Sequence, residues 1–105
     1  MMVLDRRYDL ADEDTLERMR ALTDYWARKH GVRVEWKGSD VTIAGKVTGV
    51  KFDGSVRIGG GTIHAEMNAG FLAEKLGARR YVERKLDDYL DPGKSLAELR
   101  ARIPA

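Results

Sequence analysis

His64 and Glu66 come nearest, among the side chains of this sequence, to a motif that could do chemistry. A His-x-Glu tripeptide is the first half of the zinc deaminase signature, in which the histidine binds the metal and the glutamate transfers protons. The second half of that signature needs two cysteines, and the sequence contains no cysteine. On a strand, residues i and i+2 point to the same face, so alternation at a solvated sheet face also explains the pair. We therefore reject a deaminase and keep, as the alternative, a general acid–base pair on an open sheet.

Arg79 and Glu83 form the second candidate pair, because residues four apart lie on the same side of a helix. The apolar stripe of that helix consists of Leu72, Leu76, Leu86 and Leu90. The helical phase places the pair near the middle of this stripe, where an ion pair could orient a ligand in a pocket. The competing interpretation is a partly exposed surface pair, because a kink at Gly77 would shift the helical phase.

The two tryptophans are the largest apolar side chains of the sequence. Trp26 lies on the apolar stripe of an expected helix, and Trp36 lies on the apolar side of an expected strand. Core packing explains both positions, because large aromatic side chains dominate small cores. A ligand cavity lined by the two tryptophans is the alternative.

The bulk composition indicates one globular domain and excludes several classes of function. The chain has 105 residues, of which 43% are hydrophobic and 34% are charged. Its 19 basic and 17 acidic side chains give a net charge of +2 and are interleaved, so we expect no nucleic acid partner. The lack of cysteine removes thiolate metal sites and cysteine nucleophiles, and we expect no metal and no cofactor. No apolar run approaches the ~18 residues of a membrane span and no signal peptide is recognisable, so we expect a cytoplasmic protein.

The first third of the chain predicts a short strand over residues 3–10 and then an amphipathic helix. Asp14 and Glu17 resemble a capping box at the helix start. Apolar residues recur at three- and four-residue spacing as far as Trp26, which predicts one buried stripe. Gly31 is placed to end the helix in the left-handed conformation.

Beyond Gly31 the apolar period changes to two, which predicts a meander of about four short strands as far as residue 68. The triplet of glycines at 59–61 lies between two strands, so it predicts a hairpin turn rather than a phosphate-binding loop. Residues 71–91 then predict a long closing helix, which Gly77 would allow to kink. Pro92 and Gly93 end this helix.

These elements predict an α+β fold with an antiparallel sheet of four to five short strands. The N-terminal helix and the long C-terminal helix would pack on one face of this sheet. Residues 1–91 would form the single domain, and residues 92–105 a tail with a short helix. Ser95 and Glu98 supply a capping-box pattern for that short helix.

Three short runs in the second half of the chain carry a resemblance to a known family: Gly54-Ser55-Val56-Arg57-Ile58, Ile63-His64-Ala65-Glu66-Met67 and Gly70-Phe71-Leu72. With these runs, residues 8–91 resemble the polyhydroxyalkanoic acid system family, a small bacterial family. The chain departs from the family pattern in the spacing of residues 73–80, and Ala69 stands where the family usually has a larger apolar residue. The resemblance implies an association with polyhydroxyalkanoate metabolism or storage granules, and it transfers no catalytic residues.

The leading functional hypothesis is a non-enzymatic domain that acts at polyhydroxyalkanoate granules through an apolar surface or shallow cleft. A granule or an acyl ligand is the partner that the resemblance implies. The expected ligand or partner surface consists of Trp26, Trp36, Phe71, Leu72, Leu76, Arg79 and Glu83. Two alternatives remain open: a carrier or enzyme for a small hydrophobic ligand with a helix-grip-like cavity, and a homodimeric interaction module that pairs through the tail or an edge strand.

Overall fold

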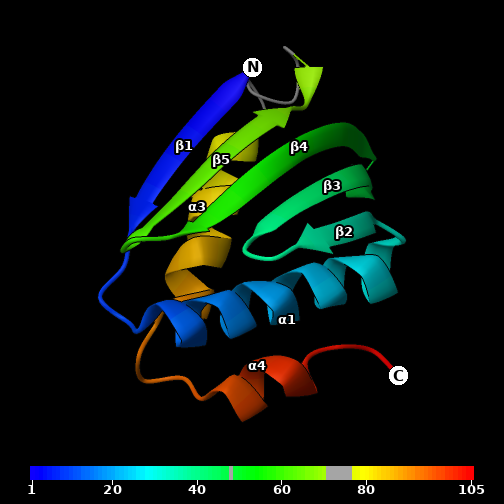
Figure 1. Ribbon diagram of the computed structural model, residues 1–105. Coiled ribbons are helices and arrows are strands. Elements are labelled where there is room, and N and C mark those ends of the chain that lie inside the picture. The colour runs from blue at the N-terminus through cyan, green and yellow to red at the C-terminus, as the bar shows by residue number, and fades with distance from the viewer. Residues whose placement is uncertain (48, 71–76) are drawn as a thin grey trace.

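The structure is a computed structural model that describes residues 1–47, 49–70 and 77–105 of the chain. Five strands and three helices lie within these residues (Figure 1). The strands are β1 (Met2–Arg7), β2 (Arg33–Lys37), β3 (Asp40–Val47), β4 (Val50–Gly59) and β5 (Thr62–Asn68), and the helices are α1 (Asp12–His30), α3 (Ala78–Tyr89) and α4 (Leu96–Ala101).

The five strands form one antiparallel sheet in the order β1-β5-β4-β3-β2. Strands β2 to β5 are the predicted meander, and β1 joins it at the outer edge of β5. One row of paired residues crosses the whole sheet on its covered face: Leu4, Ala65, Val56, Val41 and Trp36. The neighbouring residues in each strand point to the open face and are mostly polar, as the two-residue period predicted. The prediction of an α+β fold with an antiparallel sheet of four to five strands is therefore confirmed, and the sheet has five.

The glycine triplet forms the β4–β5 hairpin turn, with φ of 61° at Gly60 and 79° at Gly61. The backbone N–H of Gly61 donates a hydrogen bond to Asp12 Oδ1 at 3.3 Å, and the Tyr8 hydroxyl donates to the same oxygen at 2.6 Å. The hydrogen bond from Tyr8 lowers the pKa of the Asp12 carboxyl, and burial raises the pKa of the Tyr8 hydroxyl. This turn therefore connects the sheet to the first turn of α1.

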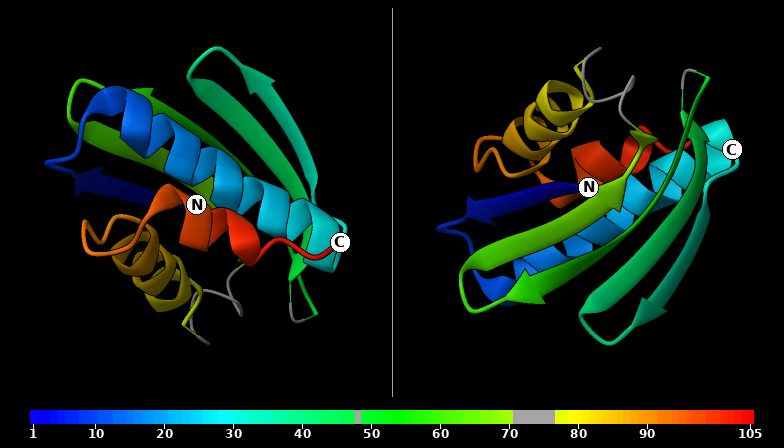
Figure 2. Two further views of the ribbon diagram at one scale, coloured as in Figure 1. Left: turned by 90° about the horizontal axis from the view of Figure 1, so that it is seen from below. Right: turned by 90° about the horizontal axis from the view of Figure 1, so that it is seen from above.

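Helix α1 lies against the covered face of the sheet (Figure 2). It buries Met19, Leu22 and Trp26. Its start differs from the predicted capping box, because the N-cap residue is Ala11 and makes no side-chain hydrogen bond. The acidic side chains lie instead within the first turn, where they suit the positive end of the helix dipole. Gly31 ends the helix with φ of 68°, as its position predicted.

The prediction of a long C-terminal helix is wrong. Helix α3 has 12 residues and α4 has 6 residues. Gly77, directly before α3, has φ of 96°, which lies in the left-handed region and cannot belong to a continuous α-helix. The glycine that was expected to kink a helix instead lies directly before α3.

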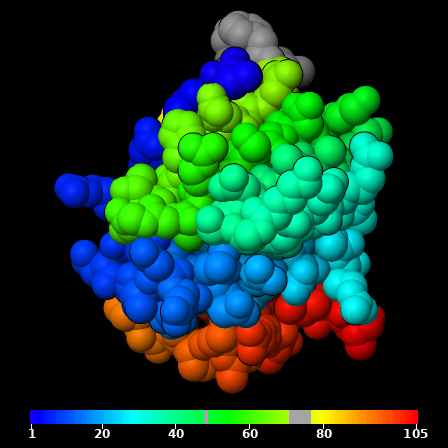
Figure 3. All heavy atoms as spheres, in the orientation of Figure 1, coloured from blue at the N-terminus to red at the C-terminus, as the bar shows by residue number. Residues whose placement is uncertain are grey.

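Helix α4 packs against the side of α1 that faces away from the sheet, at the lower edge of the molecule in Figure 3. Its Leu99 side chain is completely buried, at 0% exposure. The N–H of Glu98 donates to Ser95 Oγ at 3.1 Å, which confirms the predicted N-cap. No helix within the described residues is long and apolar enough to cross a membrane.

Candidate functional site

An apolar cleft of about 240 Å³ opens between one end of the sheet and the helical layer. The strands contribute Met2, Val47, Val50, Phe52 and Met67, and the helices and their connections contribute Trp26, Ala69, Gly77, Ala78, Tyr81 and Val82. The strand residues come from the start of β1 and β4 and from the end of β3 and β5, so the cleft lies at a single end of the sheet. The two methionines add flexible apolar side chains, which adapt to ligands of varied shape.

Helix α3 forms one wall of the cleft with its first turns. Ala78, Tyr81 and Val82 lie at positions i, i+3 and i+4, so they share one face of the helix. Trp26 forms the opposite part of the wall from α1 and donates its indole N–H to the Tyr81 hydroxyl at 3.3 Å. Trp26 is 6% exposed, whereas Tyr81 is 36% exposed and marks the mouth of the cleft.

The chemistry of the cleft is that of apolar binding. Among the described residues that line it, the side-chain polar groups are the Trp26 indole N–H and the Tyr81 hydroxyl, and these bind each other. A pocket with satisfied polar groups and apolar walls binds by shape and by exclusion of water. The described lining includes no carboxylate, imidazole or amine that could transfer a proton.

The open face of the sheet carries the His-x-Glu pair that the sequence offered as a chemical motif. His64 Nδ1 lies 2.6 Å from Asp5 Oδ1, on the neighbouring strand, and His64 Nε2 lies 3.9 Å from Glu66 Oε2. The His64 side chain is 43% exposed, so the pair lacks the exclusion of water that acid–base catalysis exploits. No group of three residues able to hold a metal ion occurs in the part of the chain that the structure describes. His64 and Glu66 are therefore part of a solvent-exposed sheet face.

The structure separates the residues that the sequence proposed as one surface. Trp26 lines the cleft, but Trp36 lies on β2 at a distance from it and donates its indole N–H to Thr23 Oγ1 at 3.3 Å. The Arg20 guanidinium lies over the Trp36 ring, 5.1 Å from its centroid. Trp36 therefore packs the sheet against α1.

Arg79 and Glu83, the second candidate pair, form no ion pair with each other within the described residues. The Arg79 guanidinium points to the outer edge of β1 and donates to the Val3 carbonyl at 3.0 Å. Glu83 is half-buried on α3 and does not line the cleft. Phe71, Leu72 and Leu76 lie outside the described residues.

Sequence reasoning missed most of the cleft, including Tyr81 and both methionines. The two-residue alternation places Met2 and Met67 on the covered face, which was the available signal. Nothing in the spacing of Tyr81 indicates its hydrogen bond with Trp26, 55 residues earlier.

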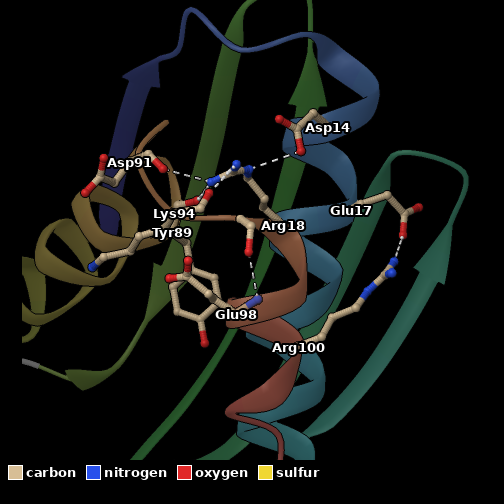
Figure 4. Close-up of polar contacts among 9 residues, drawn as sticks. Asp14, Glu17, Arg18, Tyr89, Asp91, Lys94, Glu98 and Arg100 are labelled. Carbon is tan, nitrogen blue, oxygen red and sulfur yellow. Dashed lines mark hydrogen bonds and ion pairs between the residues drawn. The ribbon is translucent and has the colours of Figure 1, made fainter.

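A second polar cluster lies at the C-terminal end of α3, where it stabilises the fold. Arg18, 5% exposed on α1, donates to the carbonyl oxygens of Tyr89 at 3.1 Å, Asp91 at 3.0 Å and Lys94 at 2.7 Å (Figure 4). Its Nε also donates to Asp14 Oδ1 at 3.1 Å. We call Arg18 with these four partners the clasp, because it binds the chain after α3 to α1.

The residues next to the clasp extend this attachment to α4. Asp88 accepts hydrogen bonds from Arg102 and Lys94, which lower the pKa of its carboxyl to about 2. Arg100 on α4 donates to Glu17 Oε2 on α1 at 2.9 Å (Figure 4). These charged side chains therefore pair with one another and attach α4 to α1 and α3.

The family comparison matches nearly the whole described fold. The family model described as "Putative polyhydroxyalkanoic acid system protein" covers residues 2–92, from the start of β1 to just beyond α3. No curated protein and no solved structure matches the chain. The matched range includes every strand and the described lining of the cleft. The chain therefore belongs to the polyhydroxyalkanoic acid system family.

Proposed function

We propose that the protein is a non-enzymatic component of polyhydroxyalkanoate storage that attaches to the granule by holding an apolar segment in the cleft. The observation that carries the proposal is a solvent-accessible cleft with apolar walls in a chain of this family. The absence of a proton-transfer group from the described lining supports binding rather than chemistry.

The size of the cleft indicates a narrow occupant. Its volume of about 240 Å³ is below the ~300–1,000 Å³ of pockets for drug-sized ligands. A single unbranched acyl segment fits such a space better than a bulky ring system does. Each buried methylene group contributes about 0.8 kcal/mol, so a segment of a few carbons gives weak attachment at one site. Many protein molecules on one granule would then bind individually and reversibly.

A carrier for a soluble acyl monomer is the second candidate, because the same cleft would accept a free chain. A granule-attached protein remains with the polymer after washing, whereas a carrier is released by competing free acyl chains. The homodimer alternative places the contact elsewhere, at β2, which is an edge strand of the sheet.

Co-sedimentation with purified granules tests the proposal. We expect the wild-type protein to be enriched on granules over a control protein of the same size. Ala78→Asp places a carboxylate in the cleft wall and should abolish the enrichment, while an aspartate in the first turn of α3 suits the helix dipole. Ser55→Asp adds the same charge on the open sheet face and should leave the enrichment unchanged.

Thermal unfolding of both variants verifies that each is folded before binding is compared. The proposal is overturned if the wild-type protein shows no enrichment, or if Ala78→Asp binds granules as well as Ser55→Asp does.

A further inference from the structure

We propose that the cleft recognises the carboxylate end of an acyl chain, and that Lys85 is the residue that binds this carboxylate. The inference rests on the proposed function, because it identifies which part of a polyester or its monomers enters the cleft. It follows from the position of one ammonium group beside the mouth of the cleft.

The Lys85 ammonium lies over two aromatic rings. Its Nζ is 5.8 Å from the ring centroid of Tyr81, which lines the cleft, and 5.4 Å from that of Tyr25 on α1. Cation–π contacts of this kind hold an ammonium in place without neutralising its charge. Lys85 does not itself line the cleft, but its ammonium lies next to Tyr81, which does, and it is free to bind an anion there.

Lys85 has no carboxylate partner in the part of the chain that the structure describes. The ion pairs among these residues do not include Lys85. Lys29 brings a second ammonium to the Tyr25 ring, at 5.8 Å from its centroid. Two ammonium groups, Lys85 and Lys29, therefore lie beside the Tyr25 ring, and charges of one sign gathered in this way attract an anionic group.

The carboxylates nearest to Lys85 in the sequence are not paired with it. Asp87 pairs with Arg6, and Asp88 pairs with Lys94 and Arg102. Glu83 is half-buried, and in the described part of the chain no ion pair joins it to Lys85.

An apolar cleft with a cation at its mouth is complementary to a chain with an apolar body and an anionic end. A carboxylate bound by Lys85 would make a charge-assisted hydrogen bond, which is stronger than one between neutral groups. The ester groups inside a polyester carry no net charge, so they cannot use this contact. Free hydroxyacids and the terminal carboxylate of a polymer chain share the required chemistry.

A pair of probes that differ only in charge tests the inference: 3-hydroxyoctanoate and its methyl ester. The titration uses the fluorescence of Trp26 in a Trp36→Phe background, because Trp26 lines the cleft and would then be the only tryptophan. We expect the acid to bind at least tenfold more tightly than the ester at low salt. Raising the salt concentration should weaken the binding of the acid and leave the binding of the ester unchanged.

Variants of Lys85 assign the effect to this residue. Lys85→Gln should reduce the affinity for the acid to that for the ester, without changing the affinity for the ester. Lys85→Arg should retain the preference for the acid. Lys37→Gln is the matched control, because Lys37 is an exposed lysine on the open sheet face.

The outcomes separate the inference from the function on which it rests. Equal binding of the acid and the ester to the wild-type protein overturns the role of Lys85 and leaves attachment through the cleft intact. A preference for the acid that survives Lys85→Gln also overturns the role of Lys85. Binding of neither probe, together with no enrichment on granules, overturns both proposals.

Discussion

The two ends of α3 differ in their surroundings. At the C-terminal end, charged groups are paired within the fold, whereas the first turns border an apolar cleft. Arg18 and Asp88 bind the chain after α3 to α1 and α4. Lys85, one turn before the C-terminal end, contacts only aromatic rings in the described contacts. Lys85 and Asp88 are only three residues apart in α3, so this short helix carries both a charge used for stability and a charge available for binding.

Buried polar groups also differ between the clasp and the cleft. At the clasp a buried guanidinium is tolerated because its donors meet three carbonyl oxygens and a carboxylate. At the cleft the buried Trp26 indole has one hydrogen-bond partner, and the rest of the described lining is apolar. Mutations at the clasp should thus change stability with little effect on ligand binding, and mutations at the cleft should do the reverse.

Replacement of Arg18 should have the largest effect on stability. In Arg18→Met, three backbone carbonyl oxygens lose a charged donor, and each such hydrogen bond contributes about 1.5–3 kcal/mol without full additivity. We expect the free energy of unfolding to fall by about 4 kcal/mol, measured by urea denaturation. Arg28→Met, on the exposed side of α1, should change it by less than about 0.5 kcal/mol. An unchanged unfolding midpoint for Arg18→Met would contradict the clasp.

Truncation of Leu99 should have the second-largest effect on stability, because it leaves a cavity between α4 and α1. Leu99→Ala removes a fully buried side chain, and such substitutions cost about 2–5 kcal/mol. We expect a loss of about 3 kcal/mol in the free energy of unfolding. Leu96→Ala, at a half-buried position of the same helix, should cost clearly less. Equal losses for the two variants would mean that α4 is not docked through Leu99.

Acid should reduce the stability of the fold through Asp88, next to the clasp. Arg102 and Lys94 hold the pKa of Asp88 at about 2, below its ordinary value of 3.8. A lowered pKa in the folded state stabilises the fold above pH 3.8, and this contribution is lost as the pH falls through about 2. We expect the loss to be about 1 kcal/mol, as for a partly exposed ion pair.

The pH dependence of thermal unfolding between pH 4 and pH 2 measures this contribution. In Asp88→Asn the slope should be smaller than in the wild-type protein, while Asp53→Asn on the open sheet face should keep the wild-type slope. An unchanged slope in Asp88→Asn would assign the acid sensitivity to other carboxylates.

The smallest effect on stability is expected at the cleft. Tyr81→Phe removes the hydroxyl that accepts from the Trp26 indole, and a net loss of about 0.5–1 kcal/mol follows. The same change should shift the fluorescence emission of Trp26, which Tyr25→Phe should not do. A larger loss of stability than in Leu99→Ala would mean that the cleft, like the clasp, is primarily structural.

The sequence allowed most of the sheet to be predicted, because strand alternation is a local signal. The covered face of β3 and β5 follows directly from Val41, Ile43, Ile63 and Ala65. The glycine turn at 59–61 and the stop at Gly31 also follow from local conformational preference. The long C-terminal helix was predicted wrongly, since apolar periodicity continues across Gly77 and does not reveal its positive φ.

The candidate site was less predictable, because its contacts join distant parts of the chain. Helical phase placed Trp26 on a buried stripe, but its partner Tyr81 is 55 positions away. Arg18 lies among apolar neighbours on the same stripe, which was a signal of a buried polar contact. The carbonyl oxygens that it binds are 71–76 positions away and carry no side-chain signature at all.

The position of α4 has a consequence for how the limits of this domain should be drawn. The family match ends at residue 92, and both the Lys94 carbonyl and Leu99 lie beyond it. A chain cut at the end of the family match would lose one acceptor of Arg18 and expose the part of α1 that α4 covers. We therefore expect the cooperatively folding unit to extend beyond the boundary of sequence similarity. A fragment defined by similarity alone would carry a newly exposed apolar surface, and granule attachment measured on it would report that surface as well as the cleft.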